Sequence, residues 1–180
     1  LVEEDGTITA NSVGSKTGTI VLNGLGGSIV LSGKVTAAGQ NAGTVGGQVE
    51  VDGNQGVTLS AAARVSASGA AGGGTVAIGT TLARANGGPG TTSILTATTV
   101  DVKKGATITA SASANGNGGR VTVLSSVSTT MAGAIAADGG PKGGNGGMVE
   151  VSGATLSLPG TITVSAPLGT PGTILEDPRP

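Results

Sequence analysis

Two carboxylates, Glu50 and Asp52, stand two positions apart in a stretch with the alternating pattern of a β-strand. Side chains two apart in a strand point to the same face, so this pair could act as a weak acid pair or hold a cation. The same spacing is typical of a solvated outer face, which is the interpretation we favour. The absence of histidine and cysteine excludes Ser–His and Cys–His nucleophiles and thiolate metal sites.

The remaining carboxylates are scattered, and the chain contains no aromatic side chain. They are Glu3, Glu4, Asp5, Asp101, Asp138, Glu150, Glu176 and Asp177. β-Helix enzymes that act on polysaccharides gather Asp, Arg or Lys in a groove, often beside aromatic platforms for sugar rings. We therefore predict that the protein is not an enzyme and has no catalytic, cofactor-binding or metal-binding residues. A groove lined with Asp and Arg would instead favour a polysaccharide-binding or polysaccharide-cleaving β-helix.

A glycine-rich run at residues 143–148 partly matches the calcium-binding nonapeptide repeat. That repeat has Asp at its sixth position, where this chain has Met148, so we interpret the glycines as turn formers. Lys103 and Lys104 precede Gly105, and we expect them to form a turn rather than a phosphate site.

Three Thr-x-Thr segments are centred on Ile8, Ile108 and Ile162, and ice-binding solenoids use such segments. An ice-binding face needs a long, flat and regular array of outward threonines. Other residues interrupt the array here, so we do not favour that function. The interruptions are Ser66, Ala136 and Asp138.

The composition indicates an ordered β protein with many turns. Glycine accounts for 36 of 180 residues, far above the usual share of about 7%. The glycines do not follow the three-residue period of collagen, and the net charge of −1 with abundant Val, Ile, Leu and Thr argues against disorder. The chain has no basic excess for nucleic acid and no apolar run long enough to span a membrane.

Three kinds of short apolar element recur along the chain. Elements of the first kind are β-branched residues followed by small residues, and they begin at Ile8, Val35, Val65, Ile108, Ile135 and Ile162, at spacings of 27, 30, 43, 27 and 27 positions. Glycine pairs followed by alternating strands occupy residues 26–33, 46–53, 73–79, 118–124 and 143–153. A third, less regular element occupies residues 57–59, 100–102 and 155–158. Repeats of roughly 20 to 30 residues are too short for propeller blades and indicate a solenoid.

We predict an all-β fold, a right-handed parallel β-helix (β-solenoid) of about six to seven coils, with residues 1–180 as one segment. Alternation places Val149 and Val151 inward and Glu150 outward, and we expect no helix. The glycine pairs and the Asn-Gly steps at Asn115 and Asn145 are expected to supply positive φ angles at corners, without binding a ligand. The interval between residues 76 and 121 is interpreted as two coils, with an extra strand at residues 93–96. No polar cap is evident at either end, so the segment is expected to continue in a longer rod or to stack on neighbours.

The last third of the chain resembles large bacterial exoproteins of the filamentous haemagglutinin type. The resemblance rests on the run GGNGGMVEVSG (residues 143–153), then Leu156, then SAPLGTPGTILEDP (residues 165–178). It is specific over about residues 118–178 and looser elsewhere. The resemblance implies a right-handed parallel β-helix exported by two-partner secretion through an outer-membrane transporter. The Asn-Pro-Asn-Gly-type motif of the family's secretion domain is absent, so the segment looks like shaft.

These observations lead to one functional expectation and to alternatives from other classes. We expect a secreted, non-catalytic shaft at the bacterial cell surface that extends or presents an adhesive region, with no cofactor. Its partners would be the transporter during export and a receptor or glycan that the sequence does not identify. The alternatives are a subunit that self-associates end to end into an extracellular filament or matrix, and a polysaccharide-binding β-helix.

Overall fold

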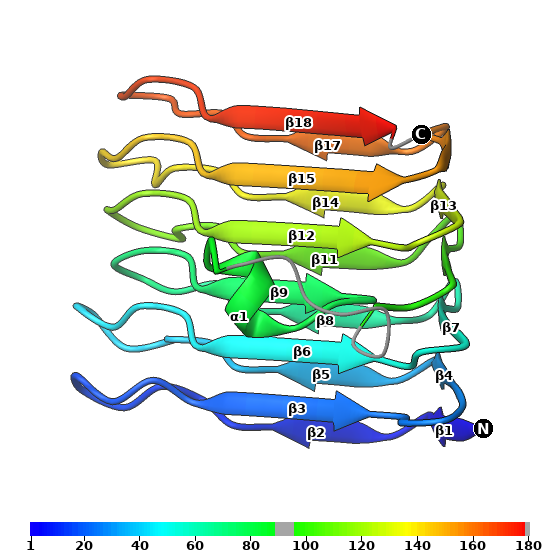
Figure 1. Cartoon of the computed structure of the whole chain (residues 1–180). Coiled ribbons are helices and arrows are strands. Elements are labelled where there is room, and N and C mark those ends of the chain that lie inside the picture. The colour runs from blue at the N-terminus through cyan, green and yellow to red at the C-terminus, as the bar shows by residue number, and fades with distance from the viewer. Residues whose placement is uncertain (89–95, 179–180) are drawn as a thin grey trace.

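The protein is a right-handed parallel β-solenoid. The computed structural model describes residues 1–88 and 96–178. In these residues, each of six coils gives one strand to each of three six-stranded parallel sheets. The chain runs along the front of Figure 1, turns at the right and returns behind, rising one level per coil. The prediction of an all-β parallel β-helix of about six to seven coils is confirmed, with six coils in the described residues.

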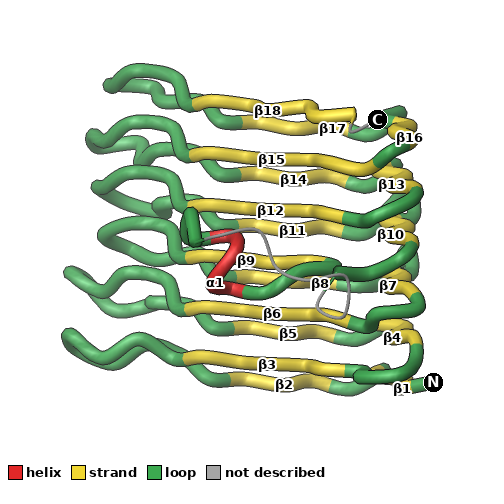
Figure 2. The backbone as a smooth tube through the Cα atoms, viewed as in Figure 1, coloured by secondary structure: helices red, strands yellow, loops and turns green. Residues whose placement is uncertain are grey.

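Each sheet contains the corresponding strand of successive coils. The first sheet comprises β1 (Val2–Glu4), β4 (Ser28–Leu31), β7 (Gly56–Leu59), β10 (Thr99–Val102), β13 (Ser128–Met131) and β16 (Thr155–Ser157). The second comprises β2 (Thr7–Thr9), β5 (Lys34–Thr36), β8 (Arg64–Ser66), β11 (Thr107–Thr109), β14 (Ala134–Ala136) and β17 (Thr161–Thr163). The third comprises β3 (Thr19–Asn23), β6 (Gln48–Asp52), β9 (Thr75–Ile78), β12 (Arg120–Leu124), β15 (Met148–Gly153) and β18 (Thr173–Pro178). Figure 2 shows the longer loops between the second and third sheets projecting at the left.

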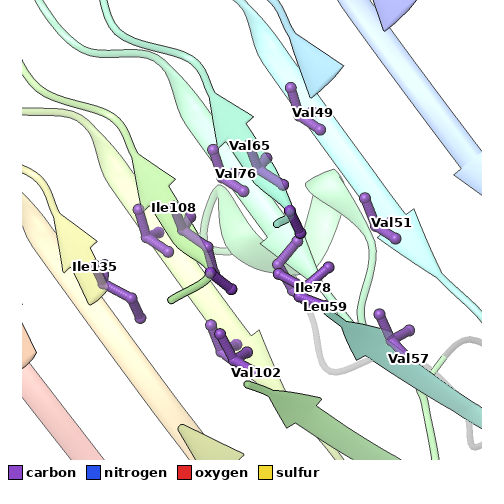
Figure 3. Packing of buried hydrophobic residues seen from close by; sticks show 14 of the residues in the cluster. Val49, Val51, Val57, Leu59, Val65, Val76, Ile78, Val102, Ile108 and Ile135 are labelled. Atoms are coloured by element: carbon purple, nitrogen blue, oxygen red, sulfur yellow. The ribbon is translucent and has the colours of Figure 1, made fainter. Parts of the chain in front are cut away.

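Inward side chains at equivalent positions stack into columns along the solenoid axis. One such column runs from Ile8 in the first coil to Ile162 in the last. Each of its residues is in register with the equivalent residue one coil away. Val65, Ile108 and Ile135 of this column are no more than 1% exposed. Figure 3 shows them in the interior of the solenoid, and they share one core cluster with side chains of the first and third sheets. The space is narrow enough for Val, Ile, Leu and Ala to fill it without aromatic rings.

One glycine-paired segment was assigned to the wrong set of strands. Residues 28–31 form β4 in the first sheet, whereas the segments that begin at residues 46, 73, 118 and 143 lead into third-sheet strands. The third-sheet strand of the first coil is instead β3, which follows the single Gly18. Both β4 and β3 place an Ile-Val-Leu run after a glycine and one hydroxyl residue, so local pattern alone does not separate them.

The interval between Val76 and Val121 is one coil, and the interpretation as two coils is wrong. These two residues are direct partners in the pairing of β9 with β12. The extra length lies in the connection from β9 to β10, which includes α1 (Leu82–Ala85), a short helix that we did not expect. Thr81 caps α1, because its hydroxyl accepts the N–H of Arg84 at 3.2 Å. Residues 93–95 of the expected extra strand lie outside the described residues.

The glycine pairs before the third-sheet strands are required by close packing and not by positive φ angles. Gly74 is not among the glycines with positive φ, but a Cβ on it would lie 1.9 Å from the carbonyl oxygen of Gly47, one coil below. The same column continues through Gly119, Gly147 and Gly172, each against the glycine carbonyl of the preceding coil. The expected positive φ angles do occur at Gly26 (+78), at Gly116 after Asn115 (+149), and at Gly143 and Gly144, whereas Gly146 after Asn145 has no positive φ.

Candidate functional site

Charged side chains gather beneath α1, on the outer face of the third sheet. α1 lies over β6, β9 and β12, where Figure 1 shows it in front of the sheet. Its Ala85 is 1% exposed, and Ala77 of β9 beneath it is fully buried. Residues that alternation places outward are therefore shielded from solvent in these coils.

Glu50 and Asp52 are buried, so the interpretation as a solvated face is wrong. Glu50 is 8% exposed and its Oε2 accepts the backbone N–H of Leu82, the first residue of α1, at 2.8 Å. Asp52 is 3% exposed, and its Oδ1 is buried with no hydrogen-bond partner. Sequence reasoning missed this because the covering element comes from the connection between the following strands.

Arg84 and Glu150 form an ion pair that sequence reasoning did not identify. The guanidinium donates from Nη2 to Oε1 at 2.5 Å and from Nη1 to Oε2 at 3.1 Å, a two-point contact. Ser152 also donates to Glu150 Oε1 at 3.0 Å. The Glu150 side chain is 6% exposed and that of Arg84 is 17% exposed. Arg84 belongs to no recognisable sequence motif, so nothing near it in the sequence indicates that it pairs with Glu150.

Asp52 is buried beside Glu50, the second carboxylate of β6, and this placement alters its electrostatics. Burial, together with the nearby Glu50 carboxylate, raises the pKa of Asp52 from 3.8 to about 6. Within residues 1–88 and 96–178, no three acidic side chains are grouped closely enough to hold a metal ion. Glu50 and Glu150 hold α1 in place through Leu82 and Arg84, so these two carboxylates have a structural role.

The other residues singled out in the sequence lie in turns and at strand ends. Lys103 and the Gly105 that follows belong to a tight turn, closed by the N–H of Ala106 donating to Lys103 O at 3.0 Å, and Lys103 forms an ion pair with Asp101. Gly143 and Gly144 adopt φ angles of +141 and +114. The run at residues 143–148 thus contains turn-forming glycines.

Two asparagines join neighbouring coils in the loops between the second and third sheets. Asn117 Oδ1 accepts the N–H of Asn145 at 2.8 Å, and Asn145 Oδ1 accepts the N–H of Thr170 at 3.0 Å. These hydrogen bonds satisfy backbone donors where the sheet ladder is absent. The asparagine at 145 therefore has a role in coil-to-coil pairing as well as in turning the chain.

The Thr-x-Thr segments share the outer face of the second sheet but do not form a continuous threonine array. One outward column starts at Thr7 and ends at Thr161, and it is interrupted in the second, third and fifth coils. The interrupting residues are Lys34, Arg64 and Ala134. The second outward column contains Ser66 and Ala136.

Both end coils carry a carboxylate at a position that the inner coils fill with aliphatic side chains. In the last coil, Glu176 is in register with the fully buried Val151, and it lines the open end of the core beside Met131 and Ile174. In the first coil, Glu4 is in register with the fully buried Leu31. The same end coils also expose apolar side chains, Leu1 and Val2 at one end and Ile174 and Leu175 at the other, so one carboxylate does not amount to a polar cap.

The comparisons with known proteins identify a solved structure of similar fold. No protein-family model matches the chain, and no curated protein matches it. The crystal structure of the HMW1 secretion domain from Haemophilus influenzae is similar to it with a TM-score of 0.70 and 29% sequence identity. The likeness confirms the resemblance to the β-helix of filamentous haemagglutinin-type exoproteins. It covers 92% of this chain and 42% of the neighbour's chain, so this chain corresponds to less than half of that domain.

Proposed function

We propose that this chain is a β-helix segment of a secreted bacterial exoprotein and acts as a non-catalytic shaft at the cell surface. The observation that carries the proposal is the uninterrupted stacking of six coils with 29% identity to a secretion domain over 92% of the chain. An outer-membrane transporter of a two-partner system would export it. None of the helices in the described part of the chain has the length and apolarity to cross a membrane.

The mechanism of a shaft is mechanical. Each coil adds about 4.8 Å along the axis, the spacing of hydrogen-bonded strands, and each contacts mainly its neighbours. Three parallel ladders and the inward columns resist bending, because a bend would open hydrogen bonds and packed contacts on one side. Reach then scales with the number of coils, and residues 1–180 would form one part of a longer rod that presents an adhesive region.

End-to-end self-association of copies is the alternative function, and it would bury the inward-position carboxylates of the end coils. A copy stacked on β18 would enclose the carboxylate of Glu176, and its own Glu4 would enter the same joint. Burying an unpaired carboxylate in an apolar interior is strongly unfavourable. Stacking a copy on either end is therefore costly unless these carboxylates gain a partner, and the same holds for any further coil of a longer rod.

Electron microscopy and sedimentation of the purified chain over a range of concentrations test the choice between shaft and filament. We expect short single rods whose sedimentation does not change with concentration. Uniform filaments that lengthen with concentration would overturn the shaft proposal and favour the self-assembling subunit.

Export is tested separately in the native host, with an antibody raised against the purified chain. The shaft proposal expects labelling of intact cells, and loss of that label after brief external protease treatment. Label found only after cell lysis would contradict a surface location.

A further inference from the structure

Basic side chains concentrate at the edge where the first sheet turns into the second. Lys34, Arg64, Lys103 and Lys104 all lie at this edge in the second to fourth coils, and all four are exposed. These four residues make up almost half of the nine lysines and arginines in the chain. We call these four residues the basic corner. The net charge of the whole chain is −1, so this clustering is local.

Two members of the basic corner stand directly beside each other. Lys34 and Arg64 are register partners in the pairing of β5 with β8, and like charges at opposed positions destabilise a sheet. Among the described residues, no acidic group lies within 4.0 Å of Lys34 or Lys104. Lys34 and Arg64 therefore keep a repulsive contact without an ion partner in the described part of the chain, whereas Lys103 of the same corner pairs with Asp101.

Arg64 is held in place by main-chain carbonyls. Its Nη1 donates to Ala63 O at 2.8 Å, to Gly105 O at 2.9 Å and to Ala61 O at 3.1 Å. The contact with Gly105 links the third coil to the fourth. These acceptors are neutral, so the guanidinium keeps its positive charge uncompensated at the surface.

A groove continues the basic corner toward the C-terminal coils. It has a volume of about 520 Å³ and is lined by Lys104, Gly105, Pro159 and small residues. Thr107, Ala134 and Thr161 form one wall of the groove, and register pairing makes them the direct continuation of the column that contains Lys34 and Arg64. Cationic side chains and groove thus form one straight track, parallel to the axis, over the second to sixth coils.

We propose that the basic corner and this groove bind a linear acidic polysaccharide lying along the solenoid axis. The positive charges recur at about 4.8 Å, one coil apart, so a chain with regularly repeated carboxylates could engage several of them at once. A single-stranded nucleic acid would need aromatic side chains for base stacking, and the sequence has none. The inference develops the polysaccharide-binding alternative, and it holds whether or not the solenoid acts as a shaft.

The experiment measures binding of the purified chain to polygalacturonate, with fully methyl-esterified polygalacturonate as the uncharged probe of the same backbone. The test variant is Lys34→Gln with Lys104→Gln. The control variant is Lys16→Gln with Lys142→Gln, which removes the same charge from exposed residues in loops between the second and third sheets. Arg64 is left intact because its hydrogen bonds join two coils.

We expect the wild-type chain to bind polygalacturonate at low ionic strength and not to bind its methyl ester. The Lys34/Lys104 variant should lose about tenfold or more in affinity for polygalacturonate, which is about 1.4 kcal/mol of binding free energy. The affinity of the Lys16/Lys142 variant should change by less than about twofold. The thermal midpoint of the Lys34/Lys104 variant should not fall, because Lys34→Gln relieves the repulsion with Arg64. Equal losses in both variants, equal binding of the methyl ester, or no binding of polygalacturonate would overturn the proposal.

Discussion

Glu50 and Glu150 hold α1 from opposite sides, although they belong to the second and fifth coils. Glu50 accepts the N–H of Leu82 at the start of the helix, and Glu150 receives the guanidinium of Arg84. Both carboxylates belong to one outward column of the third sheet, with Ala77 and Thr122 between them. A helix too short to be stable alone is therefore fixed across four coils of the solenoid.

Replacing Arg84 with methionine should loosen α1 and destabilise the protein by about 2 kcal/mol. The change removes a charged hydrogen-bonding group and leaves the buried Glu150 without its ion partner. Urea unfolding gives the free energy, and amide hydrogen exchange at Asn86, whose N–H donates to Leu82 O, reports on the helix. Arg64→Met, at an exposed arginine with neutral acceptors, should leave the exchange rate of Asn86 unchanged. If amide exchange at Asn86 were unaltered in Arg84→Met, the ion pair between Arg84 and Glu150 would not be holding α1 in place.

Asp52→Asn should stabilise the protein at neutral pH and have little effect in acid. The folded pKa of Asp52 is about 6, above its ordinary value of 3.8, so the folded protein retains a proton that the unfolded chain releases. Wild-type stability should therefore decrease as pH rises through this interval, by up to about 3 kcal/mol from this group, and the cost should persist above it. Asparagine cannot ionise, so the variant lacks this contribution.

Urea unfolding of both proteins at pH 4 and pH 7.5 measures this difference. Asp5→Asn, at an exposed position, serves as the control, since its difference from wild type should vary less with pH. If the Asp52→Asn advantage were the same at both pH values, the buried carboxylate would not be the source of the pH dependence.

Gly74→Ala should cost about 3 kcal/mol or prevent folding, because its Cβ would overlap the carbonyl oxygen of Gly47 at 1.9 Å. Gly27→Ala is the matched control. A Cβ there would meet its nearest atom, the backbone nitrogen of Leu1, at 3.5 Å, an ordinary contact. Thermal melts followed by circular dichroism compare the two. A small decrease in melting temperature for Gly74→Ala, similar to that of Gly27→Ala, would show that neighbouring coils can move apart locally without loss of stability.

Glu176→Val should strengthen the last coil by about 1 kcal/mol and allow copies to associate end to end. The substitution completes an inward column with an aliphatic side chain in register with Val151. Sedimentation velocity at increasing concentration measures the association. Asp177→Val removes the same charge at the adjacent outward position and should not promote stacking. Equal association of the two variants would instead indicate a general effect of reduced charge.

The sequence allowed prediction of the features that repeat in every coil. The β-branched residues from Ile8 to Ile162 recur because each must fill the same narrow interior, so their spacing reveals the stacking. The same reasoning fails for the connection after β9, since a coil count taken from spacing assumes connections of constant length. It also fails for Glu50 and Asp52, whose burial depends on residues 79–88 folding back across the sheet. For the glycines directly before the third-sheet strands, such as Gly74, the cause lies in the carbonyl of the neighbouring coil and not in their own backbone angles.

The connection that carries α1 lengthens one coil while Val76 and Val121 remain in register. Axial order in this solenoid is therefore indifferent to how much chain leaves the stack between two strands. Insertions at such connections can therefore vary in sequence and length without disturbing the hydrogen-bonded pairing of the strands. Lateral features of this kind can be gained, lost or grafted one at a time, and the turn between β9 and β10 is a natural place to display a foreign peptide.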